Sequence, residues 1–220
     1  MIFLKNNIDS LLKKEIKGVF PEEGEILVKY NISYPEIELK NSFGKVFCGF
    51  YSMMAKRFES FAKTRLYREA LRYRQLENEF RPFGAVLRYV CAFSDENVIS
   101  IVTDAYVYCG GDKTESKRLS QNWDMKTGRL LLFEDFFTSE DKEHIITGIK
   151  SEGRMREKAG LSCFFKDYEK KLKSGFSKND FYLTPKGYGF FYPAGFLSDS
   201  KETEVFFLLG FKGSGEFNPY

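Results

Sequence analysis

From Asn41 to about Asn78 the sequence places apolar residues at helical spacing over a long stretch. Asn41 or Ser42 is suited to cap the start, because a short polar side chain there accepts a hydrogen bond from the first turn. A helix of roughly 35 residues would be about 50 Å long, so we predict a break or bend near residues 63–66. The apolar stripe consists of Phe43, Phe47, Phe50, Met54, Phe58, Phe61, Ala62, Leu66, Ala70 and Tyr73.

Strand patterns flank this helix on both sides, which favours an α+β fold. Residues 25–39 alternate well, and Pro35 indicates an edge position or a strand end. Residues 83–93 and 98–108 are predicted to form a hairpin around the turn at 94–97. Further strands are expected at 119–125, 129–132, 181–184, 188–192 and 205–211, the last apolar on both faces and therefore central. Further helices are expected at 6–20, 139–149 and 155–173.

The polar side of the long helix carries arginines, but glutamates interleave with them. Such interleaving is typical of a solvated face. The net charge is +3, from 34 basic and 31 acidic residues, so we expect no nucleic-acid partner. There is no apolar run of about 18 residues, and residues 1–7 lack the zones of a secretory signal. We therefore expect no transmembrane segment, and a cytoplasmic protein if the chain is full length, or an extracytoplasmic one if a leader was removed.

Cysteine and histidine are too dispersed to suggest a metal site. The four cysteines are Cys48, Cys91, Cys109 and Cys163, and the only histidine is His144. No Cys-x-x-Cys pair occurs, so we expect neither a metal nor another cofactor. Three of the cysteines, all except Cys109, have apolar neighbours and are expected to be reduced, buried thiols. Disulfides stay open as an alternative for an exported protein.

Few side chains suggest catalysis. The candidate groups are Glu134 with Asp135, Asp104 with Asp112, and Cys109 with His144. Acidic residues at a helix start usually stabilise the helix N-terminus, and a cysteine nucleophile requires an adjacent base. We therefore expect that the protein is not an enzyme, and a Cys-based or carboxylate-based hydrolase is the least favoured alternative.

Several turn and core motifs resemble a known family. A Tyr-rich strand ends at Gly110 and Gly111, a strand and turn follow at 122–128, and an apolar strand leads into 133–137, with the strands at 181–192 much later. This order resembles the bacterial domain of unknown function found outside the membrane in RsiV-type anti-sigma factors. The same domain precedes the catalytic domain of PdaC-type peptidoglycan deacetylases. The likeness covers roughly residues 25–211.

The resemblance implies an α+β fold in which helices pack on a curved antiparallel sheet. It implies an N-terminal extension at 1–22, a small β-α-β subdomain at 23–110 and a larger RsiV-like subdomain at 111–220. The RsiV-type domain binds lysozyme as a protein ligand, whereas in the deacetylases the chemistry belongs to a separate domain. The family usually reads Gly-Gly-Ala-His after the Tyr-rich strand, but here Asp112 and Lys113 follow the glycines.

We therefore expect a non-enzymatic binding or sensor-type module, with a protein or a cell-wall glycan as its ligand. Aromatic rings beside a glycine pair can anchor a protein partner, although large aromatic residues are often core residues. The alternative is an intracellular regulatory or structural subunit derived from the same family. The candidate ligand-binding residues are Tyr106, Tyr108, Gly110, Gly111 and Trp123.

Overall fold

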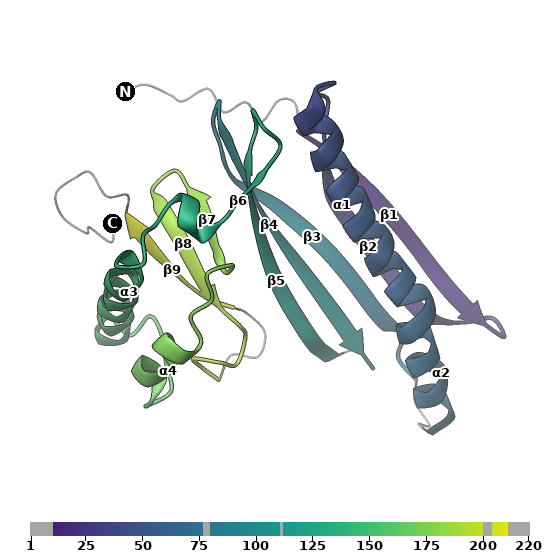
Figure 1. Cartoon of the computed structure of the whole chain (residues 1–220). Helices are drawn as coiled ribbons and strands as arrows, with labels where there is room; N and C mark the ends of the chain where they lie inside the picture. Colours follow the sequence, from purple (N-terminus) through teal and green to yellow (C-terminus); the bar gives the residue numbers. More distant parts are fainter. Residues whose placement is uncertain (1–10, 77–79, 111, 200–203, 211–220) are drawn as a thin grey trace. The chain divides into compact units, whose positions relative to one another are not determined.

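The computed structural model describes residues 11–76, 80–110, 112–199 and 204–210 and has a mixed α+β architecture (Figure 1). The chain divides into two compact units. Unit 1 contains Met1–Val90, Thr103–Lys117 and Met125–Gly128, and unit 2 contains Cys91–Val102, Arg118–Asp124 and Arg129–Tyr220. The subdomain boundaries expected from the sequence stay predictions. No helix in the described part of the chain is both long and apolar enough to cross a membrane.

The larger sheet has six strands in the order β1-β2-β3-β4-β5-β6. They are β1 (Leu11–Glu22), β2 (Glu25–Ile37), β3 (Phe83–Ser94), β4 (Val98–Cys109), β5 (Asp112–Asp124) and β6 (Leu130–Leu131). The expectation of an antiparallel sheet is wrong at one position, since β2 and β3 pair in parallel. The reason is that a helix connects these two strands and returns the chain to the end from which it started.

That helix begins where the sequence predicts it to begin. The Asn41 side chain accepts a hydrogen bond from the Gly44 backbone N–H at 2.8 Å and caps α1 (Ser42–Phe61). A π-helical segment, η2 (Ala62–Leu66), separates α1 from α2 (Tyr67–Leu76). The irregularity predicted near residues 63–66 is therefore confirmed, as an interruption of the hydrogen-bond pattern. The predicted end at Asn78 lies outside the described residues.

Strand β1 replaces the helix predicted at residues 6–20. Residues 11–22 pair antiparallel with β2 through a tight turn, in which Glu23 and Gly24 have positive φ. The helical spacing of the apolar residues was misleading, because backbone pairing with β2 outweighs local propensity. Tertiary packing requires glycine at position 18, since a Cβ there would overlap the ring of Tyr30 on β2. Residues 6–10 lie outside the described part.

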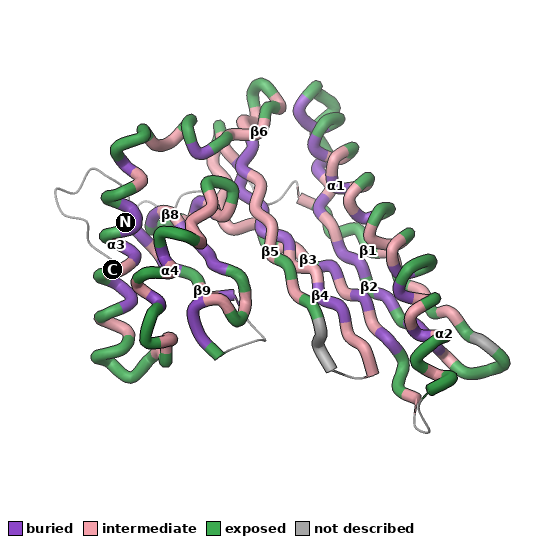
Figure 2. The backbone as a smooth tube through the Cα atoms, turned by 60° about the horizontal axis from the view of Figure 1, so that its bottom comes forward, coloured by how far each residue is buried: buried purple, intermediate pink, exposed green. Residues whose placement is uncertain are grey.

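The core of unit 1 lies between the helix and one face of the sheet. Figure 2 shows the buried positions of α1 along one side of the helix and the exposed ones along the other. Strand β2 contacts this helix and contributes several residues to the core. The fully buried members include Leu27, Val28, Ile32, Ala55, Ala62, Leu66 and Ala70.

Unit 2 contains the second sheet and the later helices. After η3 (Phe133–Asp135) the chain forms α3 (Asp141–Lys158) and α4 (Tyr168–Ser174), then β7 (Phe181–Thr184), β8 (Gly187–Tyr192) and β9 (Val205–Gly210). The predicted hairpin of β7 and β8 is confirmed. Gly187 is required at its turn, because its φ is +151° and a Cβ would overlap the Leu209 carbonyl oxygen.

Two expectations for unit 2 are wrong. The helices predicted at 139–149 and 155–173 are divided differently, because α3 continues to Lys158 and then ends at Gly160. The Gly160 φ of +68° and the bond from the Leu161 N–H to the Arg156 carbonyl form a glycine helix cap. Strand β9 is not central, because the order of the described strands is β7-β8-β9.

Candidate functional site

Two predicted ligand-binding residues, Tyr106 and Tyr108, lie on β4 in unit 1 and take part in packing. Tyr106 is 9% exposed, and the guanidinium carbon of Arg88 lies 4.8 Å from the centroid of its ring, a cation–π contact. Tyr108 is half-buried, and a Cβ at Gly84 would lie 3.3 Å from its side chain. The ring of each tyrosine therefore has a neighbour within its own unit.

The other predicted ligand-binding residues are placed differently. Gly110 has a φ of +64°, and a Cβ there would lie 3.1 Å from the Tyr73 hydroxyl. The glycine thus allows α2 to approach closely. Gly111 lies outside the described residues. Trp123 belongs to unit 2 and is 2% exposed, so its ring is part of the interior. That these residues form one ligand site stays a prediction.

The acidic pair at η3 forms ion pairs. Lys178 donates to the Glu134 carboxylate at 2.6 Å and lowers the pKa of Glu134. Arg129 donates to both oxygens of Asp135 at 2.9 and 2.8 Å, and it lowers the pKa of Asp135. The Leu132 backbone N–H also donates to Asp135, at 2.6 Å. A carboxyl group with a lowered pKa is a poor proton donor near neutral pH.

The remaining catalytic candidates are Cys109 with His144, which belong to different units, and Asp104 with Asp112. Cys109 packs against the hydrophobic core of unit 1, whereas His144 is exposed on α3 of unit 2. Asp104 is half-buried on β4, and the side chain of Asp112 is not described. Among the residues that the structure describes, no three metal-ligating side chains come together.

The cysteines are less buried than expected. Cys48, Cys91 and Cys109 are half-buried free thiols, and Cys163 is an exposed one. The prediction for Cys163 is wrong because α3 ends before it and leaves it on a surface loop. Burial raises the pKa of Cys91 to about 11, so this thiol is inert at neutral pH.

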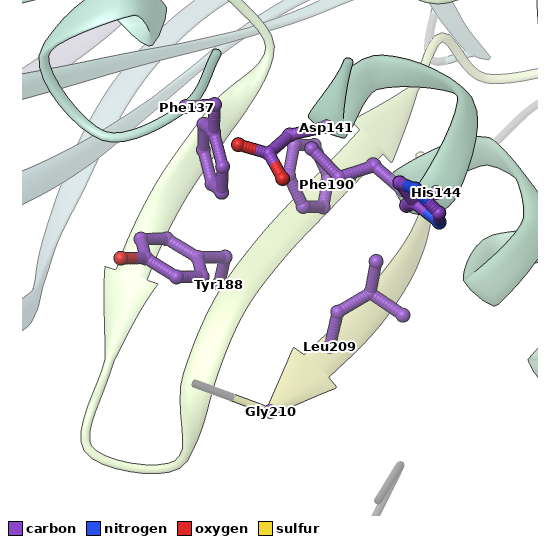
Figure 3. Close-up of a pocket in the computed structure, with 8 residues that line it drawn as sticks. Phe137, Asp141, His144, Tyr188, Phe190, Leu209 and Gly210 are labelled. Atoms are coloured by element: carbon purple, nitrogen blue, oxygen red, sulfur yellow. The ribbon is translucent and has the colours of Figure 1, made fainter. Parts of the chain in front are cut away.

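A small cavity is lined by residues of α3, β8 and β9 (Figure 3). Its volume is about 20 Å³, and its lining includes His144, Phe190 and Tyr188. Asp141, which also faces it, accepts hydrogen bonds from the Thr138 N–H and hydroxyl at 2.8 and 2.9 Å. A cavity of this size holds about one water molecule. It is too small to be a ligand site.

A larger pocket lies in unit 2 beside the start of β9, and we name it the β9 pocket. Its volume is about 410 Å³. One wall is the loop that follows α3, and the other is formed by residues 198–199 and 204–206. A backbone hydrogen bond from Phe165 N to Leu197 O, at 2.9 Å, joins the two segments. The lining residues discussed below are Arg156, Leu161, Cys163, Asp199, Glu204 and Phe206.

Two charged residues of α3, Glu152 and Arg156, bind the backbone of β9 beside this pocket. The Leu208 N–H donates to Glu152 at 3.0 Å, and Arg156 donates to the Phe206 carbonyl at 2.8 Å. Arg156 also pairs with Glu152. The backbone groups of residues 206 and 208 point to the same edge of β9, which no described strand covers. Glu152 and Arg156 therefore supply the hydrogen bonds that a neighbouring strand would otherwise make there. Burial raises the pKa of Glu152, and Arg156 opposes that rise.

Glu204 is the unusual group of the β9 pocket. It is 8% exposed, yet within the described part of the chain no hydrogen bond or ion pair engages its carboxylate. Asp199, on the same wall, is exposed and has no described partner either. Buried carboxylates are rare in proteins unless they are paired. The pocket therefore presents an acidic group that can accept hydrogen bonds from a ligand.

The sequence analysis singled out none of these pocket residues apart from Cys163. A signal was present in α3, where Glu152 and Arg156 continue the helical spacing of Ile145 and Ile149. A charged residue on an apolar helix face is buried and needs a partner. Glu204 carries no comparable local signal, because its burial depends on segments that are distant along the chain.

Comparison with known proteins supports the fold alone. No protein-family model matches the chain, and no curated protein matches it. A crystal structure of a DUF3298 family member from Bacteroides fragilis has a TM-score of 0.62 at 14% identity, covering 91% of this chain and 89% of that one. A DUF3298 family protein from Pseudomonas aeruginosa PAO1 has a TM-score of 0.57 at 13% identity, with 90% and 89% covered. The likeness to RsiV-type and PdaC-type proteins stays a prediction. The chain has the α+β fold of these DUF3298 proteins.

Proposed function

We propose that this chain is a non-catalytic binding module and that its ligand enters the β9 pocket. The observation that carries the proposal is Glu204, an acidic residue that is only 8% exposed and lines a cavity of about 410 Å³ without a described partner. Ligand pockets usually have volumes of about 300–1,000 Å³ and contain a few polar groups that orient the ligand.

Binding is favoured over catalysis by the state of the titratable groups. General acid–base catalysis is most effective when the pKa of the catalytic group lies near the working pH. Here the pKa of Glu134 and that of Asp135 are lowered, and the pKa of Cys91 is raised to about 11. All three shifts are directed away from neutrality. These groups stabilise the fold by ion pairs or burial, which leaves recognition as the role that the geometry supports best.

The surroundings of the pocket suit a protein or glycan ligand, as the family resemblance implies. Leu161 and Phe206 are 76% and 47% exposed at the pocket wall. Exposed apolar side chains beside a pocket contribute binding free energy when a partner covers them. A sensor-type module would use this combination of an apolar wall and a polar floor.

The test is an NMR titration of the ¹⁵N-labelled chain with a fragment library that includes cationic, anionic, neutral and sugar compounds. We expect saturable shifts at residues 198–199 and 204–206, which disappear in Cys163→Trp because the larger side chain fills the pocket. Lys166→Trp, on the same exposed loop but outside the pocket, is the matched control and should bind normally.

The proposal is refuted if no fragment gives saturable shifts at the pocket, or if Cys163→Trp binds as well as the unmodified chain. Chemical conversion of a fragment during the titration would refute the non-catalytic part. Thermal unfolding followed by circular dichroism verifies that each variant is folded, because both variants add a second tryptophan to Trp123.

A further inference from the structure

Among the residues that the structure describes, the β9 pocket is lined by one cation, Arg156, which is paired with Glu152, and by two unpaired carboxylates. The Arg156 guanidinium forms an ion pair with Glu152 and donates a hydrogen bond to the Phe206 carbonyl oxygen. Its positive charge is thus neutralised within unit 2. Glu204 and Asp199 form no ion pair with any cation in the described part of the chain. The pocket therefore favours a positively charged group over a neutral or anionic one.

The apolar wall lies next to these carboxylates. Phe206 covers the guanidinium of Arg156 at 5.5 Å with its ring and is still 47% exposed. Leu161 is 76% exposed on the opposite segment. A ligand that places a charge at Glu204 would therefore lay its remaining atoms against apolar side chains. Flexible alkyl chains with a terminal charge bury their methylene groups in this way.

Resting on the proposed function, we propose that the β9 pocket binds an alkylammonium or alkylguanidinium group, with its cation at Glu204 and Asp199 and its alkyl chain along Phe206 and Leu161. Charge-assisted hydrogen bonds to the Glu204 carboxylate supply the selectivity for the cation. This chemistry has two possible sources, a free amine or the side chain of a Lys or Arg residue in a polypeptide.

The experiment uses three probes with the same five-carbon chain, namely pentylamine, pentan-1-ol and pentanoate, together with agmatine. NMR titration gives each dissociation constant, and protection of Cys163 from a maleimide reports occupancy at the pocket. We expect pentylamine and agmatine to bind at least about tenfold more tightly than pentanol, and pentanoate more weakly than pentanol. Increasing salt should weaken only the cations.

Variants locate the cation. Glu204→Gln keeps the side-chain shape and should weaken pentylamine binding at least about tenfold while leaving pentanol unchanged. Asp199→Asn, at an exposed position, should weaken it less. Glu140→Gln, an exposed carboxylate at the N-cap of α3 and outside the pocket, is the matched control and should have no effect. Thermal unfolding verifies that Glu204→Gln is folded, and Asp199→Asn keeps the test decisive if it is not.

The outcomes separate the ligand class from the proposed function. If pentanol or pentanoate binds at the pocket as tightly as pentylamine, the cation proposal is overturned and the binding function stands. If no probe protects Cys163, both are overturned. An acetylated Gly-Lys-Gly amide that binds more tightly than pentylamine assigns the source to a polypeptide. The reverse order assigns it to a free amine, and either order supports the ligand class.

Discussion

Replacing Arg156 by Met removes the cation that pairs with Glu152 and leaves a carboxylate that is 8% exposed without its partner. Breaking a buried ion pair on one side costs about 3–5 kcal/mol. Because the Arg156 side chain keeps 23% of its surface exposed, we expect the lower end, about 3 kcal/mol at pH 8. About 1 kcal/mol of this is the lost hydrogen bond to the Phe206 carbonyl oxygen and the lost cation–π contact with the Phe207 ring, whose centroid lies 5.1 Å from the guanidinium carbon.

The pH dependence identifies the charge as the cause. Burial already raises the pKa of Glu152 in the folded chain above its unfolded value, and Arg156 limits the rise. A raised carboxyl pKa contributes stability below the unfolded pKa, and this stability is lost as the pH rises through the folded pKa. Without Arg156 the pKa of Glu152 in the folded chain rises further, so the pH range between the unfolded and folded pKa values widens. The loss should therefore fall from about 3 kcal/mol at pH 8 to about 1 kcal/mol at pH 5.

The assay is urea unfolding followed by the fluorescence of Trp123, which is buried in unit 2 together with this ion pair. The matched control is the double variant Glu152→Gln with Arg156→Met, because Gln still accepts from the Leu208 N–H but carries no charge. It should recover most of the loss at pH 8. An equal loss at both pH values, or a loss below about 0.5 kcal/mol, would refute the buried-charge reasoning.

Two further predictions concern the backbone and the thiols. Gly187→Ala should destabilise unit 2 by about 3 kcal/mol in the same assay, since its Cβ would overlap the Leu209 carbonyl oxygen, whereas Gly160→Ala, in open space at φ +68°, should cost only about 1 kcal/mol. Similar values for both glycines would count against the overlap. With a disulfide reagent at pH 8, peptide mapping should find Cys163 modified first and Cys91 about 100-fold more slowly, because a pKa of about 11 leaves little thiolate. Equal rates would contradict the described burial.

Much of unit 1 could be predicted because its signals are local. The Asn41 cap, the apolar spacing of α1 and the irregularity near residues 63–66 each depend on residues within a few positions of one another. Helix hydrogen bonds join neighbours in sequence, so composition over a short window determines them. The hairpin of β7 and β8 was predictable for the same reason, through its turn at Pro185 to Gly187.

The sequence by itself therefore determined the α+β class, the long helix and the hairpin of β7 and β8. Only the tertiary structure decided that residues 11–22 are a strand, because a strand is stabilised by the partner with which it pairs. The same holds for the β9 pocket, where Arg156 and Phe206 come together across 50 residues. Burial and charge pairing at this distance depend on how the elements pack, and no local pattern around Glu204 encodes them.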